Sequence, residues 1–169
     1  MEHRQLTLMF TDIVGYSRLM GQNESQTIVL LGEYRRILLA QIQGHQGSVI
    51  EFIGDAVFAR FNTPLEAVNA GIAIQQQLTK FNQHAQPGLA KLQSRIGIHT
   101  GEVAIEDGAL YGDDVNIAAR LEPIAVADGL CLSENVYTAV KDDIQAPILA
   151  LGAQPLKNIN SKIRAYLVK

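Results

Sequence analysis

The start of the chain alternates between apolar and polar residues in a way that predicts a buried strand followed by a turn. The alternation over residues 6–11 is typical of a strand that is largely buried on both faces, and Asp12 at its C-terminal end shares a face with Leu8. Gly15 then ends the strand. Residues 13–17 therefore predict a turn into a helix, where backbone N–H groups are free to meet an anion.

Two helices are predicted from apolar residues that recur at spacings of three and four. The first covers residues 24–43. The second begins at Pro64, because Thr63 and Glu66 have the spacing of a capping box, and the run 75–77 is expected on its solvated face. The two apolar stripes consist of Ile28, Leu31, Tyr34, Leu38 and Ile42 in the first helix and of Ala67, Gly71, Ile74, Leu78 and Phe81 in the second.

A tight hairpin is predicted over residues 48–61, with Gly54 and Asp55 as its two-residue turn. Strict alternation places Val49 and Glu51 on one face of its first strand. Asp55 is then held at the tip of two buried strands. An acidic residue often occupies such a turn for conformational reasons alone, so Asp55 by itself indicates no particular chemistry.

A second hairpin is predicted over residues 92–105, turning near Thr100 and Gly101. His99 precedes that turn, and no acidic residue close to it in sequence could orient it as a general base. We therefore expect His99 to have a structural role. The remaining candidate zinc ligands, His3, His45, His84 and Cys131, have none of the spacings of a metal site.

Residues 113–124 predict a helix that Asp113 or Asp114 caps. Asn116 and Arg120 are four residues apart and share one helix face, away from the apolar residues. An amide and a guanidinium aligned in this way can clamp a phosphate or a developing negative charge. Taken alone, the same pattern also fits an exposed asparagine and a surface arginine.

The C-terminal part of the chain carries no acid–base constellation and is predicted to be scaffold. Strands are expected near residues 130–132, 148–151 and 163–168, and a short helix after Ser133.

Composition limits the classes of partner. The chain has 169 residues, of which 47% are hydrophobic and 18% charged, so we expect one folded domain spanning residues 1–169. The formal net charge of -3 argues against a general nucleic-acid or anionic-membrane surface. The single cysteine excludes a disulfide framework. With neither a signal pattern nor an apolar run near twenty residues, the expected location is cytoplasmic.

Four segments taken together resemble the landmarks of class III nucleotidyl cyclase catalytic domains. They are FTDIVGYS at 10–17, IGDAVFARF at 53–61, RIGIHTGEV at 95–103 and YGDDVNIAARLE at 111–122. Their order and spacing match, and the resemblance covers nearly the whole chain. It implies an α+β fold with a ferredoxin-like βαββαβ core, extra C-terminal strands and covering helices. It also implies a head-to-tail homodimer with active sites at the subunit interface.

The resemblance assigns Asp12 and Asp55 as the carboxylates that hold two Mg²⁺ or Mn²⁺ ions, with the Ile13 carbonyl in one metal shell. Two such ions can activate the ribose 3′-hydroxyl and neutralise the triphosphate of a nucleoside triphosphate. The further implied phosphate ligands are the backbone amides of Val14, Gly15, Tyr16 and Ser17 and a lysine near the C-terminal hairpin, assigned to Lys157 with Lys162 as the alternative.

The same resemblance implies that Asn116 orients the ribose and that Arg120, reaching over from the partner chain, stabilises charge on the α-phosphate in the transition state. Each protomer then carries both halves of the catalytic apparatus. A homodimer would contain two complete sites.

Base selection is expected to depend on Glu51 and Ala109, which occupy the positions where adenylate cyclases of this family usually have Lys and Asp or Thr. A carboxylate accepts hydrogen bonds from guanine N1–H and N2–H, whereas adenine N1 is an acceptor, so Glu51 favours GTP. Ala109 supplies no group for guanine O6. The alternatives are an adenylate cyclase with relaxed base selection, a catalytically silent nucleotide-binding or dimerisation module, and a polymerase-palm relative that makes cyclic dinucleotides.

Overall fold

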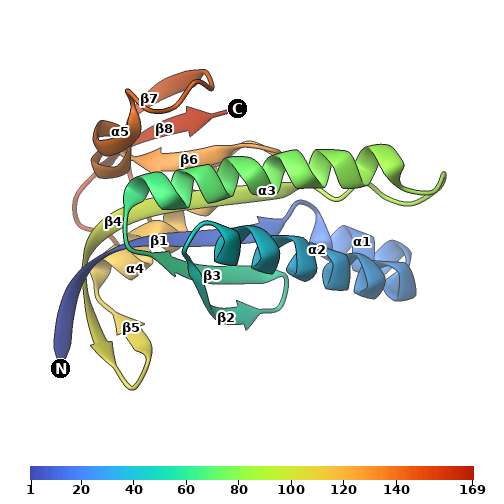
Figure 1. Ribbon diagram of the computed structural model, residues 1–169, viewed down its shortest axis with the longest axis horizontal. Coiled ribbons are helices and arrows are strands. Elements are labelled where there is room, and N and C mark those ends of the chain that lie inside the picture. The colour runs from blue at the N-terminus through green and yellow to red at the C-terminus, as the bar shows by residue number, and fades with distance from the viewer.

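The computed structural model describes residues 1–169 and shows an α+β fold (Figure 1). The elements in chain order are β1 (Glu2–Ile13), α1 (Tyr16–Gln22), α2 (Glu24–Gly44), β2 (Ser48–Ile53), β3 (Ala56–Phe61), α3 (Pro64–His84), β4 (Ser94–Glu106), β5 (Ala109–Tyr111), α4 (Asp113–Leu121), the 3₁₀ turn η1 (Glu122–Ile124), β6 (Leu130–Ser133), α5 (Glu134–Val140), β7 (Ile148–Gln154) and β8 (Ile163–Val168).

The sheet has the strand order β2-β3-β1-β4-β6-β8-β7, with the short β5 paired to β4. β1 lies antiparallel to both β3 and β4, and β4 lies parallel to β6. This arrangement confirms the predicted ferredoxin-like core with extra C-terminal strands. The strands expected near 130–132, 148–151 and 163–168 and the short helix after Ser133 are also present.

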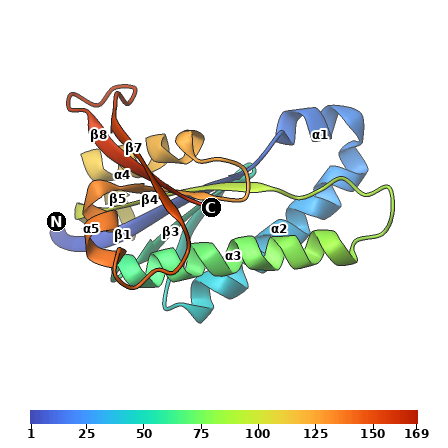
Figure 2. The same cartoon turned by 90° about the horizontal axis from the view of Figure 1, so that it is seen from above.

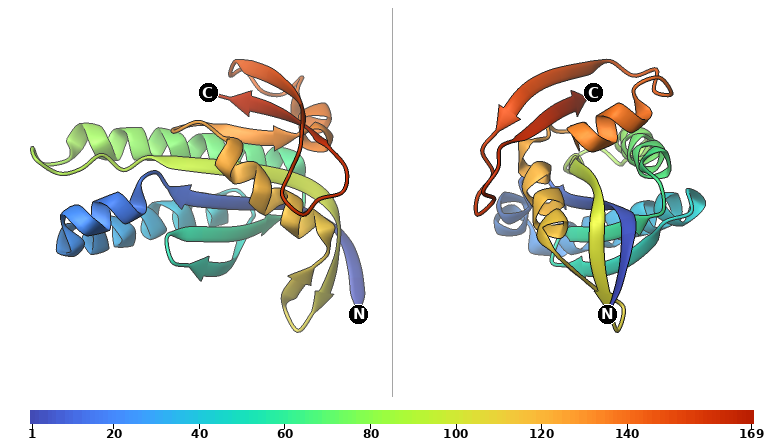
Figure 3. Two further views of the ribbon diagram at one scale, coloured as in Figure 1. Left: turned by 180° about the vertical axis from the view of Figure 1, so that it is seen from behind. Right: turned by 90° about the vertical axis from the view of Figure 1, so that its left-hand side faces the viewer.

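Helices cover both faces of the sheet. The long helices α2 and α3 lie side by side on one face, and α4 lies on the other (Figures 2 and 3). The main core fills the space beneath α2 and α3 and includes Met9, Tyr34 and Ile74. A smaller core, centred on Leu6 and Leu8, packs against α4. We call the face covered by α4 the α4 face.

The two long helices begin where the sequence predicted. Asn23 caps α2 by accepting a hydrogen bond from Gln26 N, and the predicted capping box of Thr63 and Glu66 is formed at the start of α3. Two predictions about their faces are wrong. Ile28 is 54% exposed because Thr27 and Leu30, and not Ile28, form the buried side of the first turns of α2.

Gln75 is buried instead of solvated. Its side-chain amide donates to the carbonyl oxygens of Ser94 and Gly129, at 3.1 and 3.0 Å. These two carbonyls belong to the start of β4 and to the residue before β6, and Ser94 O also accepts from the Asp128 amide at 2.9 Å. The Gln75 amide therefore links the two strand ends from within the helix stripe.

The hairpin of β2 and β3 turns at Gly54 and Asp55 as predicted, and Gly54 has the positive φ of 58° that such a turn requires. A bulge interrupts β2, because Val49 pairs with Ala59 and Glu51 pairs with the next residue, Phe58. The prediction that Val49 and Glu51 share a face is therefore wrong. The bulge turns Glu51 onto the α4 face, and β2 is largely exposed instead of buried.

The predicted hairpin turn at Thr100 and Gly101 is also wrong. β4 continues to Glu106, because β1 pairs with it over the whole of both strands, from Glu2 with Ile105 to Ile13 with Ser94. The chain turns instead at Asp107 and Gly108, both with positive φ, and the short hairpin projects beyond the sheet (Figure 1). None of the helices combines the length and the apolar composition that crossing a lipid bilayer requires.

Two glycines provide a matched test of packing. A Cβ at Gly97 of β4 would overlap the backbone of Leu121 and Glu122, whereas a Cβ at Gly32 of α2 would meet no atom within 4 Å. We expect Gly97→Ala to lower the free energy of unfolding by about 1–3 kcal/mol through overpacking. Gly32→Ala should raise it by about 0.5–1 kcal/mol through helix propensity. Urea unfolding of both variants measures the difference, and a neutral Gly97→Ala would contradict the close approach of α4.

Candidate active site

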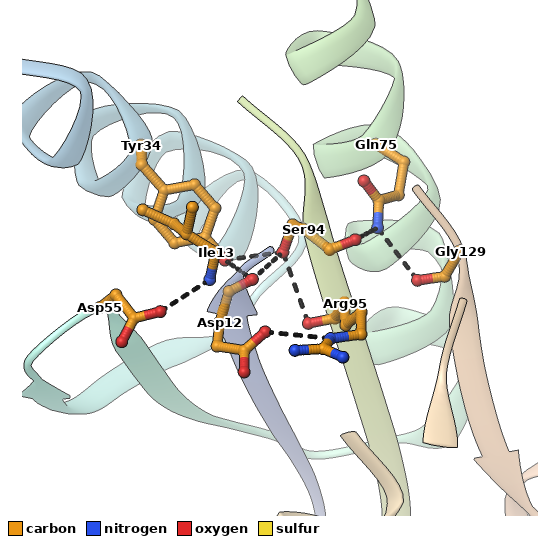
Figure 4. A network of polar contacts seen from close by, with 8 residues as sticks. All are labelled: Asp12, Ile13, Tyr34, Asp55, Gln75, Ser94, Arg95 and Gly129. Carbon is orange, nitrogen blue, oxygen red and sulfur yellow. Dashed lines mark hydrogen bonds and ion pairs between the residues drawn. The ribbon is translucent and has the colours of Figure 1, made fainter. Parts of the chain in front are cut away.

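Two carboxylates meet where β1 ends beside the β2–β3 turn. β1 pairs with β3 up to Thr11 and Val57, which brings the turn next to Asp12. Asp55 Oδ2 accepts a hydrogen bond from the Ile13 amide at 3.0 Å (Figure 4). Residues that are 42 positions apart in the sequence thus place Asp12, the Ile13 backbone and Asp55 at one point of the domain.

The end of β1 is held from the side of the main core by two hydroxyl groups. Tyr34 Oη and Ser94 Oγ lie 3.2 and 3.0 Å from the Asp12 carbonyl oxygen and 2.7 Å from each other. Tyr34 is fully buried, and burial raises the pKa of its hydroxyl well above the usual range, so it remains protonated. These contacts fix the backbone at Asp12 and leave its carboxylate on the α4 face.

Two further ionisable groups surround Asp12, and neither was singled out from the sequence. Arg95, opposite Asp12 on β4, places Nε 3.5 Å from Asp12 Oδ1. Glu122, in η1, is buried beside Asp12; burial, and then the hydrogen bond with Asp12, raise the pKa of Glu122 well above its usual range. Glu122 therefore keeps its proton near neutral pH.

The donors at this point suit a hard divalent cation. Carboxylate and carbonyl oxygens are the ligands that Mg²⁺ prefers, and Mg²⁺ commonly takes only one or two carboxylates, completing its shell with water and phosphate oxygens. No group of three or more His, Cys, Asp or Glu side chains is arranged to hold a metal by itself. Asp12, Asp55 and the Ile13 carbonyl thus fit a cation that arrives together with a phosphate.

The turn after β1 offers fewer free amides than predicted. The Ile13 amide binds Asp55, and the Val14 amide donates to Gln93 O at 2.8 Å. Gly15, with φ of 69°, precedes α1, whose first N–H groups have no acceptor within the helix. The free amides are those of Gly15, Tyr16 and Ser17.

Arg18 adds a cation to the same turn. Its guanidinium folds back over Gly15, because a Cβ at Gly15 would stand 2.8 Å from Arg18 Nη2. A side chain that bends back toward a turn leaves no periodic signal in the sequence, so pattern analysis did not find it.

Asn116 and Arg120 lie on the exposed side of α4, opposite the buried residues Ile117 and Leu121. Neither side chain makes a hydrogen bond or an ion pair within the chain. Helix α4 begins after Gly112 without a side-chain cap, so the predicted capping by Asp113 or Asp114 is wrong. The chain presents an amide and a guanidinium outward without joining them to its own Asp12 and Asp55.

The two predicted base-selecting residues lie on different strands. Glu51 is exposed on the α4 face, beside Phe58, whose ring stacks on Phe10 at 4.3 Å. Ala109 is half-buried at the start of β5. No hydrogen bond engages the Glu51 carboxylate, which is therefore free to receive donors from outside the chain.

The two candidate lysines differ in their surroundings. Lys157 is exposed and follows Leu156, which is buried against Ile117 and Leu121 of α4. Lys162 instead lines a cavity with His99 and Ser133. Lys157 thus follows directly after a residue that packs against the helix carrying Asn116 and Arg120.

Comparison with known proteins identifies the family. The sequence model of the family described as "Adenylate and Guanylate cyclase catalytic domain" matches residues 1–169. The chain belongs to the class III adenylate and guanylate cyclases.

Individual relatives of this cyclase domain agree with that assignment. A putative adenylate cyclase 3 from Rhizobium meliloti (strain 1021) is 30% identical over 164 residues, which are 96% of this chain but 28% of the relative. A crystal structure of an adenylate/guanylate cyclase/hydrolase from Silicibacter pomeroyi is 35% identical, with a TM-score of 0.91 over 99% of this chain and 97% of that one. The adenylyl cyclase CyaB from P. aeruginosa is 26% identical, with a TM-score of 0.88 over 99% and 95%.

The cyclase domain also contains an unexpected acidic partner for His99. Asp114 Oδ1 lies 2.7 Å from His99 Nε2, and Ser133 Oγ lies 2.7 Å from His99 Nδ1. The sequence indicated no acidic partner close to His99. In the folded domain, Asp114, 15 residues further along the chain, provides one. Burial lowers the pKa of His99 despite the adjacent Asp114.

The lowered pKa of His99 predicts how stability depends on pH. Between the folded-state pKa and the unfolded-state value of about 6.5, the unfolded chain binds more protons, so this contribution to stability is present above about pH 6.5 and is lost as the pH falls. We expect the free energy of unfolding to fall more steeply from pH 7 to pH 5 in the wild type than in His99→Gln. Denaturant titrations across that range measure both slopes, and parallel curves would contradict the prediction.

Proposed function

We propose that this cyclase domain converts a nucleoside triphosphate into its 3′,5′-cyclic monophosphate and pyrophosphate, with GTP favoured over ATP, in a head-to-tail homodimer. The observation that carries the proposal is the junction of Asp12, Ile13 and Asp55, made by the Asp55 hydrogen bond to the Ile13 amide. The free groups of α4 supply the other half of the apparatus. The reaction forms a bond between the ribose 3′-oxygen and the α-phosphorus and breaks the bond to pyrophosphate.

Asp12, Asp55 and the Ile13 carbonyl would hold two divalent cations, which supply activation of the 3′-hydroxyl and neutralisation of the triphosphate. The amides of Gly15, Tyr16 and Ser17 belong to the turn that follows Asp12 and Ile13 and would bind phosphate oxygens. Arg95 and Arg18 add positive charge on either side of this turn. These amides and arginines would allow a chain of net negative charge to bind an anionic substrate.

The second half of the site is proposed to come from the partner. Asn116 and Arg120 are exposed and have no bonded partner within the chain, as expected of groups whose ligand lies in another subunit. Ile53 and Tyr111 are 49% and 54% exposed and would be covered by such an interface. Asn116 would orient the ribose, Arg120 would stabilise charge on the α-phosphate, and Lys157 would bind the β- or γ-phosphate.

The preference for GTP rests on Glu51. Its free carboxylate on the α4 face can accept the two N–H groups of guanine, whereas the N1 acceptor of adenine would face a negative charge. A buried polar mismatch costs about 1–3 kcal/mol, which corresponds to a preference of about ten- to a hundredfold. The adenylate cyclase names of the relatives above favour ATP, which is the alternative substrate.

The proposed reaction can be tested by turnover of the purified chain with GTP, ATP, CTP and UTP, each with Mn²⁺ and with Mg²⁺. We expect a cyclic mononucleotide and pyrophosphate, and loss of at least about a hundredfold in kcat for Asp55→Ala and for Arg120→Ala separately. Mixing these two inactive variants should restore about one quarter of the wild-type activity, since half of the dimers are mixed and each holds one complete site.

The outcomes separate the alternatives. Absence of any cyclic product from a dimeric protein would indicate the silent nucleotide-binding module, and a dinucleotide product would indicate the polymerase-like enzyme. Activity in the wild type without restoration in the mixture would contradict the shared site.

Glu51→Lys tests base selection separately. Replacing the carboxylate with an ammonium removes the acceptor for guanine N1–H and N2–H and supplies a donor for adenine N1. We expect the ratio of kcat/KM for GTP to that for ATP to fall by about ten- to a hundredfold. A wild type that prefers ATP, or a ratio that Glu51→Lys leaves unchanged, would refute the role of Glu51 while leaving the cyclisation chemistry intact.

A further inference from the structure

We propose that Asp114, His99 and Ser133 form a positioning network that fixes the rotation of helix α4 on the sheet and so places Asn116 and Arg120 in the partner's site. The inference rests on the proposed function. None of the three residues is suggested to touch the substrate.

The stretch of β4 beneath α4 has few side chains on the face that meets the helix. Gly97, His99 and Gly101 alternate along β4 and therefore point to the same face, toward α4. A Cβ at Gly97 would overlap the backbone of Leu121 and Glu122, and a Cβ at Gly101 would overlap the Asp114 carboxylate. The glycines let the helix approach closely, and His99 is the side chain that rises between them.

His99 joins three elements through two short hydrogen bonds. The imidazole lies on β4, Asp114 belongs to the first turn of α4, and Ser133 is the last residue of β6. A neutral imidazole satisfies both contacts, since Nε2–H donates to Asp114 and Nδ1 accepts from the Ser133 hydroxyl. His99 is 3% exposed and Ser133 1% exposed, so the His99–Ser133 contact is buried, whereas the Asp114 side chain is 29% exposed and its contact with His99 is partly buried.

The apolar contacts of α4 are not directional. The helix contacts the sheet and the C-terminal segment through Ile117, Ala118 and Leu121, and its first turn has no side-chain cap. The Asp114–His99 contact is directional and lies two residues before Asn116.

The functional groups of α4 are sensitive to that rotation. Turning a helix by about 10° moves an atom 5–6 Å from its axis by about 1 Å. A displacement of about 1 Å of a reacting or stabilising group can cost about a hundredfold in rate. A tether at Asp114 therefore matters more for Asn116 and Arg120 than for the survival of the fold.

The network has two other possible roles, which the same experiment separates. It could simply stabilise the domain. It could instead act on the same chain's metal-binding half, because η1 follows α4 directly and brings Glu122 to Asp12.

The first measurement is the kinetics of Asp114→Ala. We expect kcat to fall about ten- to a hundredfold while KM changes less than about threefold, the split expected when a transition-state interaction is lost. Asp114→Asn keeps the oxygen that accepts from His99 and should retain kcat within about threefold. Asp113→Ala, at the exposed neighbouring position, is the matched control and should resemble the wild type. Equal losses in Asp114→Asn and Asp114→Ala, or a change in KM alone, would overturn the proposal.

The deciding measurement mixes Asp114→Ala with the two inactive variants described above. If the defect lies in α4, a mixture with Asp55→Ala should recover activity, because the intact carboxylates of one chain meet the intact α4 of the other. A mixture with Arg120→Ala should not recover, because both chains then have a defective α4 half. The reverse pattern would place the defect in the metal-binding half, and failure of both mixtures would indicate a general loss of structure; either result overturns the proposal.

The mixture of Asp55→Ala with Arg120→Ala serves as the reference. If this reference recovers activity and the Asp114→Ala mixtures behave otherwise than expected, only the positioning network is wrong. If the reference itself fails, the shared site of the proposed function is wrong. Should Asp114→Ala not fold, Asp114→Ser, which keeps a polar group but cannot reach His99, takes its place in every mixture.

Discussion

The antiparallel pairing of β1 with β4 is the constraint on which the rest of the domain depends. It runs from Glu2 with Ile105 to Ile13 with Ser94 and sets two strands in register along the middle of the sheet. That register places Arg95 opposite Asp12 and puts Ser94 within reach of the Asp12 carbonyl. It also exposes the backbone of β4 at Gly97 and Gly101 to α4.

The two faces of this strand pair make different contacts. On one side, Tyr34 of α2 and Gln75 of α3 hold the ends of β1, β4 and the approach to β6 through backbone carbonyls. On the other side, the carboxylates and α4 meet solvent. The helices beneath the sheet thus hold the backbone at the end of β1, while the Asp12 carboxylate lies on the opposite face.

Local patterns were sufficient to predict the features that neighbours in sequence determine: the capping box at Thr63, the Gly54 turn, and the parity that puts Asp12 on the α4 face. What could not be predicted depends on contacts between distant segments. β4 continues past Gly101 because β1 lies beside it, and Gln75 is buried because its amide binds two carbonyls of distant segments. Asp114 lies beside His99 because α4 packs closely against Gly97 and Gly101 of β4.

The bulge in β2 has a consequence for variation in strand length. Ile50 is the unpaired residue between Val49 and Glu51, so its removal would turn the bulge into regular pairing and leave every other pair of the strand unchanged. Loss or gain of a residue between Glu51 and the Gly54 turn would instead reverse the side on which Glu51 emerges. Length changes in this strand are thus tolerable at the bulge and disruptive beyond it, so homologous chains that differ in length here can still present a side chain to the α4 face.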